Sequence, residues 1–328
     1  MRVFVAGASG VIGTRLVPKL IDLGHEVIGT SRSAGNAERI QALGAEPIVL
    51  DLLDPDAVRN AVLETEPEAI IHEATALTDL SDFKHFDRSF HVTNRLRTEG
   101  TDALLAAARE AGVGKFVAQS NANHRYAREG GPVKSEDDPL DPTPVPAMRE
   151  SVEAMRYIDR VVTGAGGIAL RYGIFYGDPG DGMVEAVRAR KFPVVGDGAG
   201  VWSFIHLDDA ATATALAVEH DEAGIYNIVD DEPAPVGEWL PELARILGAK
   251  PPQRFPRLVA RLFAGEAPVV MATESRGASD AKAKRELGWT LRYPSWREGF
   301  RDAYASAEQR RPDRAPARAG RSPSRLST

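Results

Sequence analysis

Cysteine is absent from this 328-residue sequence, which excludes disulfide bonds, thiol nucleophiles and zinc sites built on thiolates. No apolar run approaches the length of a membrane-spanning helix. A strand-like run begins at Val3, so we expect no signal peptide before it. Together these absences predict a cytoplasmic protein that makes no membrane contact.

Positive charge is also in short supply, since the formal net charge is −7. This balance argues against a broad basic surface, and we expect no nucleic-acid partner. In the segment 306–328, however, arginines are scattered among Pro, Ala and Ser. That composition predicts a disordered tail, with a weak anionic partner as the alternative. The histidines lack companion Cys, Asp or Glu residues at metal-ligand spacing, so no metal site is predicted.

Glycine is concentrated in the N-terminal stretch RVFVAGASGVIG. The run at its start predicts a buried strand, and the apolar pattern after Gly13 predicts a helix. Glycines remove side chains where backbone must approach a pyrophosphate, and a helix start offers N–H groups to that anion. A plain tight turn is the alternative. The predicted dinucleotide contacts are Gly7, Ser9, Gly10, Val11, Ile12 and Gly13.

Apolar runs and helical patterns alternate along the chain, including a long helical region from Phe86 to Gly112. This alternation predicts an α/β fold, a Rossmann-type doubly wound parallel sheet with ligands at the carboxyl ends of its strands. We expect the cofactor domain to span 1–171, with a further strand and helix near 201–229. A smaller substrate lobe should span most of 172–305. The strands predicted after the first are Glu26–Thr30, Pro47–Leu50, Ala69–His72, Lys115–Gln119 and Gly167–Arg171.

The end of the second predicted strand bears on cofactor choice. An acidic residue there would bind both ribose hydroxyls of NAD, whereas an arginine pairs with the 2′-phosphate of NADP. This sequence has Arg32 and no carboxylate between Val27 and Gly35. We therefore predict NADP in preference to NAD; the alternative is that Arg32 is merely solvated.

Other stretches carry a family pattern: LRYGIFYG at 170–177, WSFIHLDDA at 202–210 and KAKRELGW at 282–289. With the glycine spacing, they resemble the extended short-chain dehydrogenase/reductase proteins, in their NAD-dependent epimerase/dehydratase-like branch. The resemblance covers residues 1–300. It implies an NAD(P) cofactor, a small-molecule substrate and a possible homodimer through the long helices. In the second stretch, the acidic pair Asp208-Asp209 is expected to cap a helix.

The resemblance also implies further cofactor contacts. An Asp followed by an apolar residue after the third strand contacts adenine in the family, and small residues after the fourth strand pass beneath the cofactor. A serine follows the fifth strand, and the segment after Arg171 passes the nicotinamide. In this sequence the matching positions are Asp51, Leu52, Ala74, Thr75, Ala76, Ser120 and Tyr172. His72, inside an apolar run, is instead expected to be a packed core histidine.

The catalytic pair of the family is missing. Hydride-transferring members use a Tyr and a Lys four residues later, the Tyr as proton donor and the Lys to lower its pKa and hold the ribose. Counting back from the strand 167–171 puts this motif at Val145 and Arg149 or, in a second register, at Ser151 and Met155. The nearest substitute, Tyr157 with Arg160, cannot reproduce the tuning because a guanidinium stays charged and the spacing is three residues.

Three polar residues after the fifth strand are the candidate replacements. Asn121 stands where the family has a hydroxyl that polarises the substrate carbonyl; an amide can donate that hydrogen bond but cannot relay a proton. His124 titrates near neutral pH and Tyr126 lies on the same loop, so either is a candidate acid or base. The alternative for both is an exposed polar loop.

One position bears on the substrate. Nucleotide-sugar epimerases of the family pair an arginine with the substrate pyrophosphate where this chain has Trp202. An aromatic ring cannot replace bidentate phosphate pairing, so we expect a less charged substrate than a nucleotide sugar. The sequence predicts an NAD(P)-dependent oxidoreductase, epimerase or dehydratase for a small carbonyl or hydroxyl compound, with a non-standard proton donor. The alternative is an NAD(P)-binding redox sensor or partner-binding protein without turnover.

Overall fold

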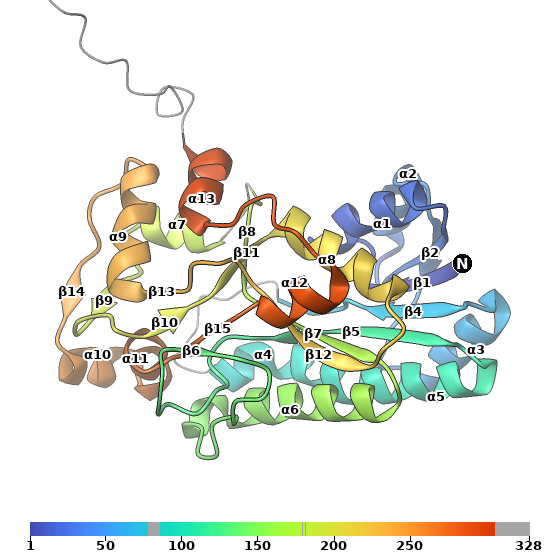
Figure 1. Ribbon diagram of the computed structural model, residues 1–328, viewed down its shortest axis with the longest axis horizontal. Coiled ribbons are helices and arrows are strands. Elements are labelled where there is room, and N and C mark those ends of the chain that lie inside the picture. Colours follow the sequence, from blue (N-terminus) through green and yellow to red (C-terminus); the bar gives the residue numbers. More distant parts are fainter. Residues whose placement is uncertain (78–85, 179, 181, 306–328) are drawn as a thin grey trace, which may run out of the picture.

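The computed structural model describes residues 1–77, 86–178, 180 and 182–305. Its centre is a seven-stranded sheet whose paired neighbours all run parallel (Figure 1). This confirms the predicted doubly wound α/β fold. The strands in spatial order are β12 (Gly224–Ile228), β7 (Ile168–Tyr172), β5 (Lys115–Asn121), β4 (Ala69–His72), β1 (Arg2–Ala6), β2 (Glu26–Ser31) and β3 (Glu46–Val49).

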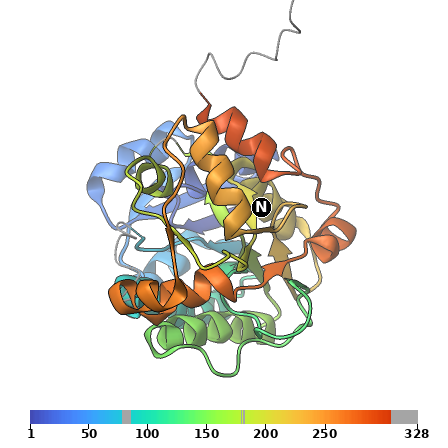
Figure 2. The ribbon, with the colours of Figure 1, turned by 90° about the vertical axis from the view of Figure 1, so that its left-hand side faces the viewer.

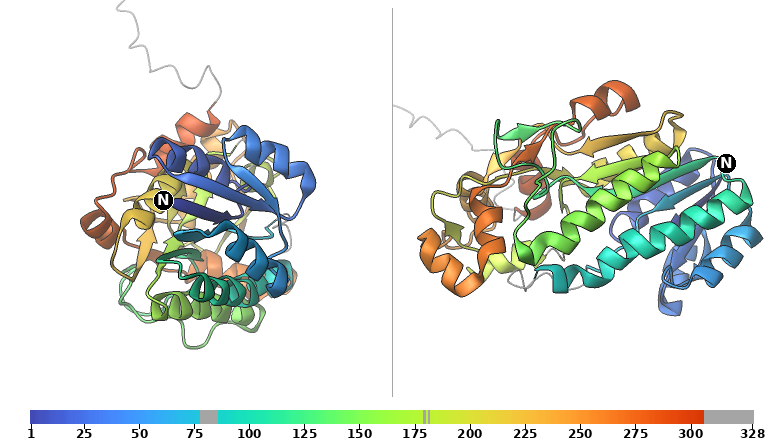
Figure 3. Two further views of the ribbon diagram at one scale, coloured as in Figure 1. Left: turned by 90° about the vertical axis from the view of Figure 1, so that its right-hand side faces the viewer. Right: turned by 90° about the horizontal axis from the view of Figure 1, so that it is seen from below.

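Helices cover both faces of this sheet, and each face buries its own apolar core (Figure 3). Strands buried on both faces are apolar throughout, as β4 is, rather than alternating. One layer contains α1 (Gly13–Asp22), η1 (Ala34–Asn36), α2 (Ala37–Ala42), α8 (Leu207–Glu219) and α12 (Ala281–Leu287). The other contains α3 (Pro55–Thr65), α4 (Phe86–Arg95), η3 (Leu96–Gly100), α5 (Thr101–Ala111), η4 (Pro146–Met148) and α6 (Arg149–Gly164).

The long helical region predicted from Phe86 to Gly112 has a π-helical turn, η3, at its centre. A π turn inserts an extra residue into an α-helix, and such turns often occur at functional sites. The turn buries Leu96, Arg97 and Gly100. It therefore directs an arginine into the interior of the protein.

After β7 the chain builds a second lobe, which Figure 2 shows end-on, and returns to the sheet as β12. The lobe has an aromatic core that includes Trp202, Phe204, Trp239 and Trp296. Short strand pairs join it to the loops around the sheet, as β6 does with β15. Its elements are β8 (Ile174–Tyr176), α7 (Gly182–Arg188), β9 (Val194–Val195), β10 (Val201–Trp202), β11 (Phe204–His206), β13 (Ala234–Pro235), α9 (Val236–Ile246), β14 (Arg254–Phe255), α10 (Arg257–Ala264), α11 (Glu266–Thr273), β15 (Gly277–Ala278) and α13 (Trp296–Tyr304), with β6 at Val133–Lys134.

The predicted cap of α8 is wrong. His206 is the N-cap, and its Nδ1 accepts a hydrogen bond from the backbone N–H of Asp208 (3.1 Å). Asp209 lies inside the first turn, where its carboxylate accepts backbone N–H groups of Arg292 and Tyr293 (2.8 and 3.0 Å). The acidic pair thus begins two residues after the N-cap position, too late to cap the helix.

Two kinds of feature are absent from the described residues. None of their helices has the length and apolar character needed to cross a membrane. They also contain no group of three or more His, Asp or Glu residues arranged to hold a metal ion. The predicted tail, 306–328, lies outside the described residues.

Candidate active site

The N-terminal glycine loop forms a close-packed turn between β1 and α1. Gly7 has a φ of +94°, in the region that favours glycine, and an added Cβ would lie 2.8 Å from the backbone nitrogen of Ala74. A Cβ at Gly13 would lie 2.5 Å from the carbonyl oxygens of both Gly7 and Ala8. Gly10 differs, because it is exposed and an added Cβ would meet only the Gly7 oxygen, at 3.2 Å. The packing of the loop leaves no space for a side chain at Gly7 or Gly13, whereas Gly10 lies on the open side of the turn.

The start of α1 presents unpaired backbone to this open side. Its N-cap, Ile12, makes no side-chain capping bond, and Val11 is 46% exposed. The first N–H groups of a helix lack intrahelical partners and bear a partial positive charge, so they bind phosphate. The turn, the exposed Gly10 and the uncapped helix together fit a dinucleotide pyrophosphate.

The carboxyl end of β2 is the position expected for the adenosine ribose. The Ser31 hydroxyl accepts hydrogen bonds from Ser9 and from the Asn36 amide, both 3.1 Å. These bonds fix the chain beside Arg32, which is exposed. Within the described part of the chain, no hydrogen bond or ion pair engages the Arg32 side chain. Its guanidinium is therefore available to a ligand phosphate.

The next two strands end in the segments predicted to contact the cofactor. After β3, the Asp51 carboxylate accepts the Leu53 N–H (3.0 Å), and Leu52 is buried. After β4, the positions 74–76 are partly buried, and the Ala76 N–H donates to the hydroxyl of Thr93 (3.0 Å). His72 is buried with its Nε2 3.1 Å from the Leu96 carbonyl oxygen, as expected of a core histidine.

A buried carboxyl group lies beside these segments. The Tyr172 hydroxyl donates to Glu73 Oε1 (2.8 Å) and lies 2.6 Å from the Thr214 hydroxyl. The second carboxyl oxygen of Glu73 is buried without a hydrogen-bond partner. Burial without a cation raises the pKa of Glu73 to about 8 and that of Tyr172 well above its ordinary value. Glu73 is therefore protonated at neutral pH.

Replacing Glu73 with glutamine should change how stability depends on pH. The folded protein keeps the Glu73 proton up to about pH 8, whereas the unfolded chain loses it near pH 4.5. Folding then takes up a proton, so the free energy of unfolding falls as pH rises through this window, by up to about 1.4 kcal/mol per unit. Glu73→Gln removes this loss, and urea titrations should show its stability relative to wild type increasing from pH 5.5 to pH 8. Parallel profiles for wild type, Glu73→Gln and the exposed control Glu64→Gln would contradict the prediction.

The structure shows what occupies the positions of the catalytic pair. Val145 is buried before α6, while Arg149 begins α6 and is exposed. In the second register, Ser151 is bonded to Asp87 and Met155 is a buried core residue. The Tyr157 hydroxyl donates to Asp102 of α5 (2.7 Å) at the exposed surface between two helices. None of these positions provides a phenol with a neighbouring lysine.

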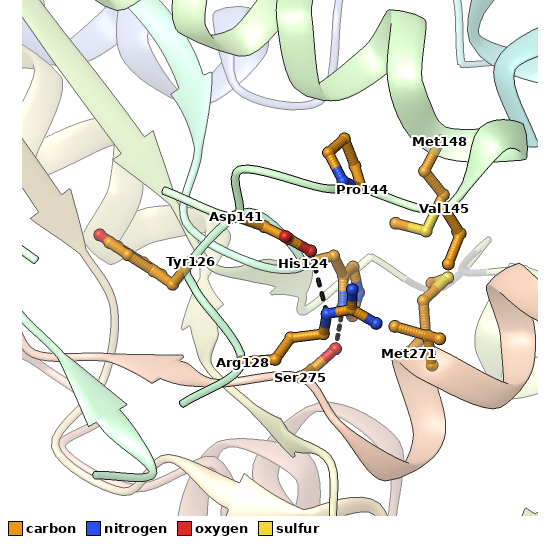
Figure 4. Close-up of a pocket in the computed structure, with 10 residues that line it drawn as sticks. His124, Tyr126, Arg128, Asp141, Pro144, Val145, Met148, Met271 and Ser275 are labelled. Carbon is orange, nitrogen blue, oxygen red and sulfur yellow. Dashed lines mark hydrogen bonds and ion pairs between the residues drawn. The ribbon is translucent and has the colours of Figure 1, made fainter. Parts of the chain in front are cut away.

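A small pocket lies next to Val145, between the sheet and the lobe (Figure 4). Val145, Met148 and Met271 form apolar walls, and His124 faces them. The Nδ1 of His124 lies 2.7 Å from the Ser275 hydroxyl, and its Nε2 is buried without a hydrogen-bond partner. Burial lowers the pKa of His124 to about 3, so its ring is neutral at physiological pH.

The other polar residues predicted on this loop have partners within the protein. The Tyr126 ring points away from the other labelled side chains in Figure 4, and its hydroxyl donates to Asn227 (2.7 Å) and accepts from Arg171 (3.1 Å). The Asn121 side-chain oxygen accepts the N–H of Asn123 (2.7 Å). Among the described side chains that line the pocket, His124 alone has a buried polar atom without a hydrogen-bond partner.

Beneath the loop lies a buried ionic network that sequence analysis missed. Asp159 of α6 accepts hydrogen bonds from both Arg125 and Arg171, and each of the three is at most 4% exposed. Arg125 also donates to the Ser120 hydroxyl (3.0 Å). The three residues are far apart in sequence, so no local pattern indicates their contact. The network holds the end of β5 against α6.

Trp202 fills the position at which the resemblance places a phosphate-binding arginine. It is 4% exposed, and its indole N–H donates to the Met271 carbonyl oxygen (2.8 Å). Its ring packs edge-on against His124, with ring centroids 4.9 Å apart. The indole therefore packs behind two residues of the pocket lining, His124 and Met271.

Comparison with known proteins agrees with this geometry. The profile of the NAD dependent epimerase/dehydratase family matches residues 3–229. The chain belongs to this family. A 3-diazoavenalumate denitrifying reductase from Streptomyces sp is 42% identical over 309 residues, covering 92% of this chain and 99% of the relative. A 2-alkyl-3-oxoalkanoate reductase from Stenotrophomonas maltophilia is 28% identical, with 76% of each chain covered.

Solved structures of the epimerase/dehydratase family share the fold. A crystal structure of Thermus thermophilus UDP-glucose 4-epimerase in complex with NAD has a TM-score of 0.71 and 26% identity, covering 93% of this chain and 98% of the other. Family and relatives identify this epimerase/dehydratase family member as an NAD(P)-dependent oxidoreductase, epimerase or dehydratase-like enzyme for a small compound. The alternative of a binding protein without turnover is not supported.

Proposed function

We propose that this enzyme is an NADPH-dependent reductase whose substrate accepts a hydride without a proton from a tyrosine. The observation that carries the proposal is the lack of a phenol at the expected tyrosine position, which holds the buried aliphatic Val145 in the first register and Ser151 in the second. The position of the lysine is Arg149, exposed at the start of α6. A ketone needs a proton as its C=O bond is reduced, whereas a cationic electrophile does not. The site therefore suits an electron-poor, cationic substrate whose positive charge is neutralised when it accepts the hydride.

The chemistry of the pocket lining favours an aromatic substrate, for which the cavity of about 10 Å³ has to widen. Met148 and Met271 present thioethers, which make favourable contacts with aromatic rings, and Val145 extends the apolar wall. Trp202 occupies the position where a nucleotide sugar would need an arginine, so we propose that nucleotide sugars are not substrates. Of Asn121, His124 and Tyr126, we propose that His124 contacts the substrate, through its unpaired Nε2.

The relative named 3-diazoavenalumate denitrifying reductase suggests the substrate class. We propose an aromatic diazonium compound. The reduced nicotinamide supplies a hydride that forms the new C–H bond at the ring carbon. The C–N bond breaks, its electron pair leaves with N2, and NADPH becomes NADP⁺ with no proton consumed. The protein's part is to hold both reactants and to exclude water from the ring, for which apolar walls suffice.

Deuterium transfer tests this function. With NADPH deuterated at C4, the enzyme is expected to place deuterium on the ring carbon that loses nitrogen, and to release one N2 per NADPH oxidised. Mass spectrometry of the product from D2O with unlabelled NADPH should show no deuterium at that carbon. Deuterium from solvent, or no N2 from any aryl diazonium tested, would overturn the proposal.

We propose NADP rather than NAD as the cofactor because Arg32 is exposed and unpaired beside the Ser31 turn. Arg32→Ala should weaken NADPH binding by about 10- to 100-fold, the value of a charge-assisted hydrogen bond, and leave NADH binding unchanged. Fluorescence titration with both nucleotides measures this. The exposed Arg109→Ala on α5 is the matched control. Equal losses for NADPH and NADH would exclude 2′-phosphate recognition by Arg32.

A further inference from the structure

Arg97 is a buried cation that finds no hydrogen-bond or ion-pair partner for two of its nitrogens within the described residues. It lies on the π-helical turn η3, is 4% exposed, and its Nε and Nη1 atoms are buried without hydrogen bonds. Among the described residues, no carboxylate lies within ion-pair distance of its guanidinium. Burial lowers the pKa of Arg97 to about 10, which leaves it charged at neutral pH.

The charges around Arg97 increase the free-energy cost of leaving it without a carboxylate partner. Asp159, the carboxylate whose charge acts on Arg97, is already paired with Arg125 and Arg171, so three buried guanidinium groups share the influence of one buried carboxylate. An unpaired buried charge costs several kcal/mol. Proteins retain such a cost mainly where a ligand relieves it.

The position of Arg97 indicates which ligand this is. Its neighbour Leu96 contacts His72, the last residue of β4, and Arg125 contacts Ser120 near the end of β5. Arg97 therefore lies at the carboxyl ends of β4 and β5, the edge of the sheet at which dinucleotides bind. The same edge carries the segment 74–76, beneath the expected cofactor. The helix α6 contains no lysine that could reach this edge, and Arg149 at its start is exposed.

We propose that Arg97 replaces the missing lysine as the cation that binds the nicotinamide half of the cofactor. Its two unpaired donors can reach two neighbouring acceptors, which fits the vicinal hydroxyl oxygens of the nicotinamide ribose. The π turn delivers the cation from the α4–α5 side of the site instead of from α6. Because the site has no tyrosine whose pKa a cation would lower, the role of this cation is to orient the nicotinamide. The proposal rests on the proposed NADPH dependence.

Calorimetric titration with NADP⁺ and with 2′,5′-ADP, which lacks the nicotinamide half, tests the assignment. Arg97→Met should lose about 10-fold or more in NADP⁺ affinity, the value of hydrogen bonds from a charged donor, and keep the wild-type affinity for 2′,5′-ADP. Arg97→Lys should retain part of the NADP⁺ affinity. The exposed Arg149→Ala should match wild type with both ligands.

Stability in the absence of ligand is the second readout. Removing an unpaired buried charge should leave the Tm of ligand-free Arg97→Met equal to or above that of wild type, whereas loss of a structural arginine would lower it. A lower Tm with unchanged NADP⁺ affinity would overturn the proposal, as would equal losses for NADP⁺ and 2′,5′-ADP. Unchanged NADP⁺ affinity with a reduced affinity for the diazonium substrate would place Arg97 at the substrate instead. Failure of the proposed cofactor preference would already appear in the wild-type titrations.

Discussion

Gly10→Ala is expected to abolish most dinucleotide binding while leaving the fold intact. Gly10 is exposed on the open side of the loop, and an added Cβ meets only the Gly7 oxygen, at 3.2 Å. The methyl group would stand where the pyrophosphate must approach the start of α1. Displacing a bound group by about 1 Å can cost ~100-fold, so we expect a loss of that order in NADPH affinity, measured by fluorescence titration.

Two other glycine-to-alanine variants serve as controls for Gly10→Ala. Gly164→Ala, at the end of α6, places a Cβ in open space and should leave affinity and Tm unchanged. Gly13→Ala drives a Cβ within 2.5 Å of two carbonyl oxygens and should lower the Tm as well as the affinity. If Gly10→Ala binds NADPH as wild type does, the pyrophosphate does not lie at this turn.

Asp159→Asn should be among the most destabilising single substitutions in the protein. Asp159 holds Arg125 and Arg171, and all three are buried. Removing its charge leaves two guanidinium groups uncompensated in the interior, which costs about 3–5 kcal/mol for a broken buried pair. Urea unfolding followed by circular dichroism measures this loss as a lower midpoint with an unchanged slope.

The exposed pair of Arg59 and Glu110 provides the control. Its atoms form a two-pronged contact like that of the buried network, but both side chains are about half exposed. Water and salt screen such a pair, so Glu110→Gln should not change the unfolding midpoint measurably. Similar losses for Asp159→Asn and Glu110→Gln would show that burial does not determine the strength of these interactions.

Local patterns were sufficient to predict most strands of the sheet, because each contains a short apolar run, as β1 and β4 do. The helix caps show where such patterns fail. At α3 the residue types do indicate the cap, since Asp54 precedes Pro55 and its carboxylate accepts the Ala57 N–H (3.1 Å). At α8, however, His206 provides the cap, and the choice depends on backbone angles that residue types do not determine. The π turn η3 could not be predicted from the sequence either, because one extra residue in a helix leaves the apolar spacing almost unchanged.

The candidate site was predictable from the sequence only in the parts that a single segment of the chain forms. The glycine loop and Arg32 are local features, and the absence of a Tyr–Lys pair is a local observation too. The partners of Tyr126 and Arg125 are set by residues 30 or more positions away, such as Asn227 and Asp159. Glu73 is a carboxylate directly after an apolar strand, but only the structure shows that one of its oxygens is buried without a hydrogen-bond partner among the described residues.

The order of the sheet has a consequence during protein synthesis. β7 pairs with β12, and the chain between these neighbours, 173–223, contributes β8 to α8 of the structure. At ribosomal rates of ~5–20 residues per second, the last strand follows its partner by roughly 3–10 seconds. Throughout that delay the edge of β7 is unpaired and its apolar side chains lack their final neighbour. An emerging chain is therefore most open to aggregation or chaperone binding between the completion of Tyr172 and that of Ile228.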